Sequence, residues 1–166
     1  VTSGTRLYRL NPATGADAWN INLGSTLGAS GVSPNNVIVV GSDSGVVYGV
    51  NPLNGGILWT RATLARIYGA PAFDNIGGVE VAYVTSEDHR LYCIRTSDGV
   101  RLWSILGSTS FRQAPIVGSD HSIYCTNTNG VVYKVNSSGA IIWQLQLGGR
   151  ARGALTLGAD GTLYIA

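Results

Sequence analysis

Arginine is the residue type whose spacing in this chain most directly indicates chemistry. Three segments rich in Gly, Ser, Thr and Ala carry Arg66, Arg112 and the pair Arg150 and Arg152, each just before a short apolar run. A guanidinium presents forked N–H donors that match a carboxylate or a phosphate. These four arginines therefore predict a binding site for an anionic group. The alternative is that they are solvated or lie flat on aromatic rings such as Tyr68 and Phe111.

The two histidines, His89 and His121, do not indicate a catalytic or metal-binding set. Each lies in a polar segment between apolar runs, and we expect these segments to be turns at opposite ends of neighbouring repeat units. A metal site or a Ser/His/Asp triad needs several such groups to converge. Aspartates fall in turn segments too, as expected from their bonding to nearby backbone. The sequence thus predicts no enzyme activity, no catalytic residue and no metal site.

Cys93 and Cys125 are the only cysteines. Each follows a tyrosine of the repeat described next, but on different strands of different units, so geometry disfavours a disulfide between them. Free cysteine is among the most buried residue types. We expect two buried, unreactive thiols.

A sequence repeat defines the strands and turns that carry all of these residues. The four tryptophans are 40, 44 and 40 residues apart, and a glycine precedes each by four residues: Trp19, Trp59, Trp103 and Trp143 follow Gly15, Gly55, Gly99 and Gly139. Each unit contains four short runs rich in Val, Ile and Tyr, bounded by Gly, Asn, Asp and Ser, which are typical of strands. Periods of roughly 40–45 residues with several strands indicate propeller blades. The predicted fold is an all-β propeller of four-stranded antiparallel blades, with strands A to D in each.

The chain carries four blades' worth of strands. It enters at strand C, around residues 5–10, and stops in strand B, at residues 162–166. The sequence therefore predicts one domain over residues 1–166, with three complete blades and two complementary half-blades, at approximately 28–61, 69–105, 113–146 and 153–166 plus 1–22. The dipeptide Asn129–Gly130 predicts a type I′ turn between strands B and C.

The repeat phrase resembles that of the pyrroloquinoline-quinone-type (PQQ-like) propeller family, Ala-x-Asp-x-x-Thr-Gly-Lys-x-x-Trp. The first unit keeps Thr14, Gly15 and Trp19, and the others keep the Gly and the Trp. The resemblance implies that each tryptophan docks on the turn of a neighbouring blade. The tryptophans and their glycines are therefore expected to form a structural girdle, and the competing interpretation is an exposed aromatic platform for a ligand.

The same resemblance bears on function. Quinone-binding members use a vicinal cysteine pair and acidic ligands within a longer chain, and this sequence has no Cys-Cys. We therefore expect no cofactor, and a non-enzymatic scaffold that binds a protein or peptide. The alternative is a fragment of a quinone-dependent dehydrogenase. The family implies an extracytoplasmic location, whether periplasmic or secreted.

Composition and the two half-blades bear on partners. A formal charge of +2 does not predict a nucleic-acid partner, and no apolar run approaches the ~20 residues that span a bilayer, so no membrane insertion is expected. With no methionine present, we expect Val1 to be an internal point of a longer gene product. The half-blades allow a closed four-bladed ring, a fragment of a longer propeller, or a homodimer that completes an eight-bladed ring. PQQ-like blades usually close at eight, which favours the homodimer.

Overall fold

Seventeen β-strands build the chain, and no helix occurs among residues 1–151 and 153–165, the part that this computed structural model describes. Three four-stranded antiparallel sheets form the centre of the molecule. Their strands are β4 (Leu27–Val32), β5 (Ile38–Ser42), β6 (Val46–Val50) and β7 (Ile57–Ala62); β8 (Ala72–Ile76), β9 (Val79–Thr85), β10 (Arg90–Arg95) and β11 (Arg101–Leu106); and β12 (Ile116–Val117), β13 (Ile123–Thr126), β14 (Val131–Val135) and β15 (Ile141–Gln146). These sheets are the predicted complete blades, with strands A to D in chain order.

Two smaller sheets flank the three blades. The first contains β1 (Thr2–Ser3), β2 (Arg6–Leu10) and β3 (Asp17–Asn22), and the last contains β16 (Leu155–Leu157) and β17 (Leu163–Ile165). The predicted strands C and D of this half-blade are β2 and β3. The two-residue strand β1 occupies the position of the end of strand B, and the sequence analysis did not predict it. The predicted strands A and B at the other end are β16 and β17. The two half-blades form separate sheets, not one.

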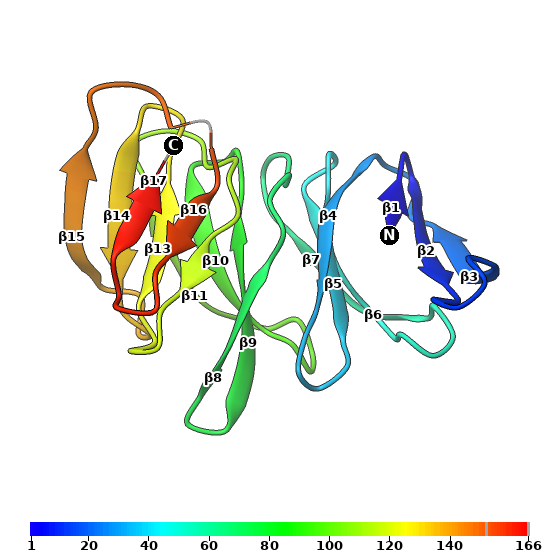
Figure 1. Ribbon diagram of the computed structural model, residues 1–166. Coiled ribbons are helices and arrows are strands. Elements are labelled where there is room, and N and C mark those ends of the chain that lie inside the picture. Colours follow the sequence, from blue (N-terminus) through cyan, green and yellow to red (C-terminus); the bar gives the residue numbers. More distant parts are fainter. Residues whose placement is uncertain (152, 166) are drawn as a thin grey trace.

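The sheets follow one another in an open arc. Figure 1 shows β1–β3 at one end of this arc and β16–β17 at the other, where β16 contacts β12 and β13, so that β1 and β17 lie far apart. The chain is therefore not the closed four-bladed ring that the sequence analysis left open. No helix in the described residues is long and apolar enough to cross a membrane.

The turns differ from prediction at one informative place. At the B–C turn after Asn127, the Gly130 N–H bonds the Asn127 carbonyl at 3.0 Å, and Gly130 alone of the dipeptide Asn129–Gly130 has positive φ. The prediction of a type I′ turn there is wrong, because a type I turn ending in a left-handed residue joins the strands. The two-residue hairpin with positive φ at both positions is instead Gly77–Gly78, between β8 and β9.

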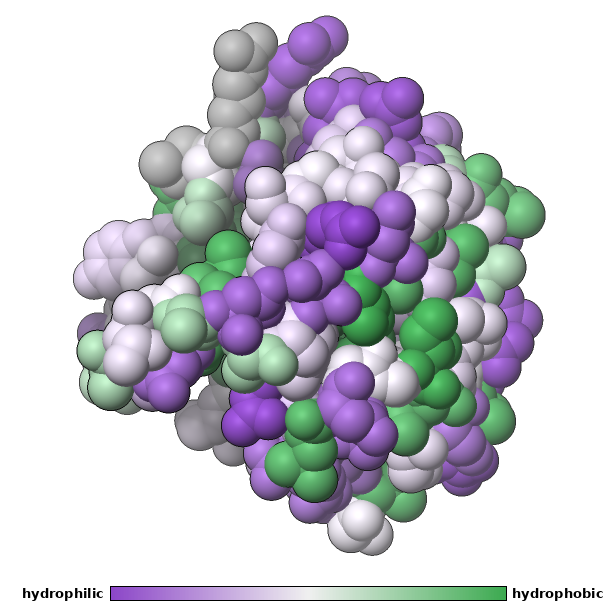
Figure 2. Space-filling view, turned by 90° about the vertical axis from the view of Figure 1, so that its right-hand side faces the viewer, coloured by the Kyte–Doolittle hydropathy of each residue, from purple (hydrophilic) through white to green (hydrophobic). Residues whose placement is uncertain are grey.

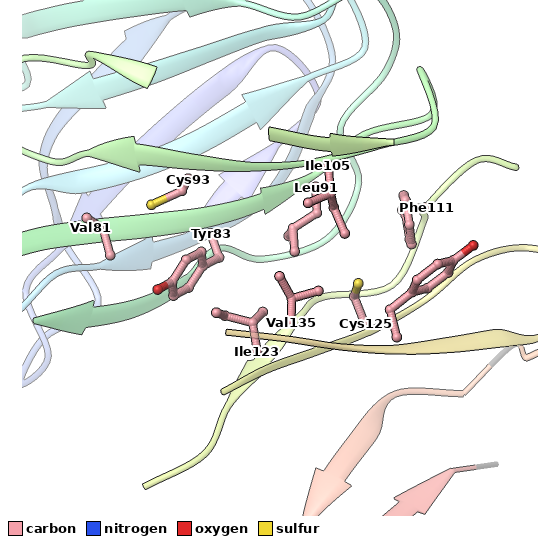
Figure 3. Packing of buried hydrophobic residues seen from close by; sticks show 10 residues of the cluster. Val81, Tyr83, Leu91, Cys93, Ile105, Phe111, Ile123, Cys125 and Val135 are labelled. Atoms are coloured by element: carbon pink, nitrogen blue, oxygen red, sulfur yellow. The ribbon is translucent and has the colours of Figure 1, made fainter. Parts of the chain in front are cut away.

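Hydrophobic packing between neighbouring sheets forms the core. One cluster joins the blade of β8–β11 to that of β12–β15, and Figure 3 shows its members pointing toward one another from the two sheets. Cys93 and Cys125 are free thiols of this cluster, each fully buried, as expected. Burial raises the pKa of the Cys93 thiol to about 12 and also raises that of Cys125. Two similar clusters join the blade of β4–β7 to that of β8–β11 and to the sheet of β1–β3, so these blades are stabilised by their neighbours.

Candidate functional site

Arg66, Arg112 and Arg150 lie on the loops that lead from strand D of one blade to strand A of the next. Backbone hydrogen bonds tie these loops to the B–C turns. The Glu87 N–H donates to the Arg66 carbonyl at 2.9 Å, and the Thr128 N–H donates to the Ser110 carbonyl at 2.8 Å. The D–A loops and the B–C turns therefore form one rim of the propeller arc, and this rim carries the arginines.

Arg66 and Arg112 meet at an aromatic ring. The Arg66 Nη1 donates to the Tyr68 hydroxyl at 3.0 Å, and the Arg112 guanidinium carbon lies 5.7 Å from the centre of the same ring. Arg112 also pairs with Glu87 at 2.5 Å. The pKa of Arg66 is raised, chiefly by its hydrogen bond to Tyr68, with Asp43 and Glu87 also contributing. Both arginines thus contact Tyr68, Arg66 through the hydroxyl and Arg112 over the ring, whereas Phe111 is fully buried.

Arg112 and Arg150 share a pocket. They line a hollow of about 330 Å³ with Thr126, Asn127 and Thr128 of the last complete B–C turn. Both guanidinium side chains belong to exposed residues, whereas Thr126 is only 1% exposed. Arg66 is not among the lining residues, and Arg152 lies outside the described residues.

One buried hydroxyl at this pocket has no partner. In the preceding blade the Thr85 hydroxyl donates to the Gln113 carbonyl at 2.8 Å. The equivalent Thr126 Oγ1 is buried without a hydrogen-bond partner in the part of the chain that is described. An unpaired buried polar group costs free energy. Because this oxygen is shielded from the pocket, the arrangement offers an anion the two guanidinium groups and not the hydroxyl.

The tryptophan positions form joints between blades. The Nε1 of three indoles donates to a carbonyl of the C–D turn of the next blade: Trp19 to Pro52 at 3.0 Å, Trp59 to Thr96 at 2.6 Å and Trp103 to Ser137 at 2.9 Å. Each ring also covers the left-handed glycine of that turn. A Cβ placed on Gly55, Gly99 or Gly139 would lie 3.0, 2.6 or 2.8 Å from the ring. Only glycine fits such a position, because the backbone has positive φ and the ring leaves no room.

Trp143 and Gly15 take no part in such a joint within the described chain. Trp143 is 39% exposed, compared with 8% for Trp59. Gly15 has the same left-handed backbone as the other three glycines, but no atom lies within 4 Å of an added Cβ. Their role in the girdle remains a prediction.

The histidines do not converge. His89 lies in the turn between β9 and β10, and its φ of 70° is the left-handed position of that turn. His121 lies in the turn between β12 and β13, where its Nδ1 is 2.8 Å from Asp74 Oδ1 of the preceding blade. Among residues 1–151 and 153–165, no three His, Cys, Asp or Glu side chains cluster as metal ligands do.

Two members of the pocket region were missed by the sequence analysis. Glu87 is separated from Arg112 by 25 residues along the chain, and Thr126 has an ordinary β-strand sequence context. The one sequence signal for Glu87 and Thr126 is their position within the repeat unit. Glu87 lies two residues after the B strand β9, where the loops that carry arginine pass, and Thr85 and Thr126 occupy equivalent positions.

Comparison with known proteins gives a consistent result. The family model described as outer membrane protein assembly factor BamB matches residues 3–154. The assembly factor BamB of Nitrosomonas eutropha is 28% identical over 99 residues, which are 60% of this chain and 23% of that protein.

Solved structures agree in fold. BamB from Moraxella catarrhalis superposes with a TM-score of 0.72 at 19% identity, over 92% of this chain and 50% of that one. Sqt1 from Saccharomyces cerevisiae superposes with a TM-score of 0.82 at 15% identity, over 97% of this chain and 47% of that one. The chain thus spans about half the length of these two propellers, and it matches 23% of the length of the Nitrosomonas protein.

Proposed function

Since this chain belongs to the BamB family of PQQ-like β-propellers, which the match over residues 3–154 establishes, we propose that it is a non-enzymatic scaffold that binds a protein or peptide. The family is named for assembling outer membrane proteins, which supports a protein partner and an extracytoplasmic location. Repeat folds supply a platform, and the specific role depends on the side chains that the platform displays.

The binding site that we propose is the pocket between Arg112 and Arg150. The observation that carries it is the presence of two exposed arginine side chains at one hollow beside the B–C turn after β13. The Glu87 carboxylate accepts a hydrogen bond from Nε of Arg112, which leaves the Nη N–H groups of that guanidinium for a ligand. Guanidinium groups bind carboxylates through paired N–H donors. The ligand group is therefore an acidic side chain or a C-terminal carboxylate of the partner.

A peptide array tests this proposal. Peptides that contain Asp or Glu are compared with the same peptides carrying Asn or Gln, using the wild-type chain, Arg150→Ala and Arg101→Ala. Arg101 is the matched control, because it is exposed on strand D at the end opposite to the D–A loops. We expect binding to the acidic peptides alone, and a loss of about tenfold in Arg150→Ala only. Equal binding to both sets of peptides would refute the carboxylate site.

The quinone-dependent alternative is tested separately. The protein is mixed with pyrroloquinoline quinone and calcium, and its absorbance spectrum is recorded after removal of free quinone. The scaffold proposal predicts no retained quinone, and stoichiometric uptake would contradict it.

We further propose that two chains form one eight-bladed ring. The open arc of sheets in Figure 1 supports this, as does the coverage of 50% of the Moraxella BamB chain by nearly all of this one. Propellers close because a ring leaves few exposed sheet edges.

A further inference from the structure

Two hollows flank the blade of β4–β7. The larger, about 800 Å³, lies beside β2 and has apolar lining from Leu7, Leu10 and Val32. Figure 2 views the molecule from the β1–β3 side and shows hydrophobic side chains exposed among hydrophilic ones. The other hollow, about 380 Å³, lies between this blade and that of β8–β11. Of the two, only the smaller is lined by a buried charged residue, so it is the one that indicates a charged ligand.

The β8–β9 hairpin forms one wall of the smaller hollow. Its tip is Gly77–Gly78, and Figure 1 shows it projecting beyond the other A–B turns. Gly78 and Val79 of the hairpin line the hollow together with Asn35 and Val37 of the preceding blade and with the C–D turn between β10 and β11. A–B and C–D turns lie on the rim opposite to the Arg112–Arg150 pocket. Both blades that enclose the hollow are complete four-stranded sheets.

Glu80 is the one charged residue that is buried among residues 1–151 and 153–165. It is 5% exposed and lines the smaller hollow. Its Oε2 accepts the Asn35 N–H at 2.7 Å, and its Oε1 accepts the Thr96 hydroxyl at 2.7 Å. An ionised carboxylate has about four acceptor sites, so each oxygen of Glu80 keeps capacity for a further hydrogen bond.

No cationic side chain pairs with Glu80 in the described part of the chain, and both of its donors are uncharged groups. Arg95 lines the same hollow, but its Nη2 and Nε bond the Asp98 carboxylate at 2.6 and 2.9 Å, so that its charge is already compensated. Buried charges in proteins are paired with an opposite charge or coordinate a metal ion. The hollow therefore presents a buried negative charge without its counterpart.

We propose that this hollow binds a lysine side chain of a protein partner, with the ammonium group at Glu80. Both Glu80 oxygens already accept one hydrogen bond, which suits a compact ammonium better than the fork of a guanidinium. Val37 and Val79 give the hollow apolar wall for the methylene stem, which lysine commonly buries. A metal ion needs several oxygen ligands, whereas the lining contains one carboxylate, that of Glu80.

An NMR titration of the isotope-labelled chain tests the proposal. The probes are lysine and norleucine, each acetylated at its amino end and methylamidated at its carboxyl end, so that they differ only in the ammonium group. Titration to about 50 mM covers the weak binding of a single side chain. We expect blocked lysine to shift the backbone amides of Asn35 and Thr96, which border the Glu80 carboxylate, and blocked norleucine to leave them unchanged. Equal shifts with both probes, or none with lysine, would overturn the proposal.

Glu80→Gln removes the charge, and Glu87→Gln is the matched control on the opposite rim. The lysine dissociation constant should rise about tenfold or more in Glu80→Gln, because a buried charge pair is lost, and should stay within about twofold in Glu87→Gln. If Glu80→Gln fails to fold, a second pair of variants decides. Ser97→Trp blocks the hollow from an exposed lining position without touching the Glu80 hydrogen bonds, and Ser138→Trp places the same ring in the corresponding turn between β14 and β15.

The outcomes separate a binding site from a structural role. Lysine shifts that are lost in Ser97→Trp and kept in Ser138→Trp support the site. Lysine shifts that persist unchanged in folded Glu80→Gln or in Ser97→Trp would overturn it. A purely structural Glu80 predicts lower stability of Glu80→Gln and no lysine-dependent shift in the wild type. None of these results bears on acidic peptides at Arg150, which are measured independently.

Discussion

Truncation of Trp59 should destabilise the fold strongly. The Trp59 side chain is only 8% exposed, its Nε1 donates to the Thr96 carbonyl at 2.6 Å, and its ring covers Gly99. A buried aromatic removes about 150–250 Å² from water, which at about 25 cal/mol per Å² is roughly 4–6 kcal/mol. Partial collapse of the space left by Trp59→Ala lowers the loss, and measured truncations of this kind cost about 3–5 kcal/mol. We therefore expect a loss of about 4 kcal/mol.

The measurement is chemical and thermal unfolding of wild type and variants at one fixed protein concentration, because association shifts apparent stability. A loss of about 4 kcal/mol lowers the melting temperature of a chain of this size by about 8–16 °C. Trp59→Phe is the control. It keeps a ring in the joint but leaves the Thr96 carbonyl without its donor, so its loss should be about 1–2 kcal/mol.

The result that would refute the joint is a loss below about 1 kcal/mol for Trp59→Ala. An exposed aromatic platform predicts that outcome, with peptide binding lost at an unchanged melting temperature. The structural role is supported if Trp59→Ala has the lowest free energy of unfolding, Trp59→Phe an intermediate one and the wild type the highest.

Three further predictions concern single groups. The buried Tyr83 hydroxyl has no hydrogen-bond partner among residues 1–151 and 153–165, so Tyr83→Phe should keep the free energy of unfolding or raise it by up to about 1 kcal/mol. Tyr133→Phe, which removes the acceptor of the Ser108 N–H, should lower the free energy of unfolding by about as much, and unfolding titrations compare the two variants. The pKa of Asp120 is lowered to about 2 by the Ser122 backbone N–H, the Ser122 hydroxyl and Lys134. The ionised Asp120 therefore stabilises the fold fully above about pH 4, and this stabilisation is lost as the pH falls toward 2. The difference in free energy of unfolding between wild type and Asp120→Asn should narrow over that range. A constant difference would contradict the lowered pKa of Asp120. Burial raises the pKa of both thiols, so Cys93 and Cys125 should react with a colorimetric thiol reagent at pH 8 only after unfolding; rapid reaction of the folded protein would contradict their burial.

The blade repeat could be predicted from sequence because its signals are local. Tryptophan spacing, the glycine four residues earlier and the alternation within short runs all arise inside one unit. The turn glycines have positive φ at all four predicted places, Gly15 included. None of these features depends on how the blades are oriented relative to one another.

The parts that escaped prediction depend on register or on neighbouring blades. The spacing of 44 between Trp59 and Trp103 shows that the third unit is longer, but the added residues extend the β8–β9 hairpin to Gly77–Gly78, a place that periodicity does not indicate. The pairing of Arg112 with Glu87 joins a D–A loop to the B–C turn of the preceding blade. Sequence placed both groups in loops, whereas their meeting depends on how adjacent sheets pack.

The central claim is that the chain binds an acidic group of a protein partner at the Arg112–Arg150 pocket. The most direct measurement is an NMR titration of the isotope-labelled chain with an acidic peptide selected on the array and with its Gln-substituted counterpart. We predict that the acidic peptide shifts the backbone amides of residues 126–128 and the Nε–H signal of Arg150, and that the Gln peptide does not. Shifts that cluster instead at the pocket beside β2, or identical shifts with both peptides, would contradict the claim.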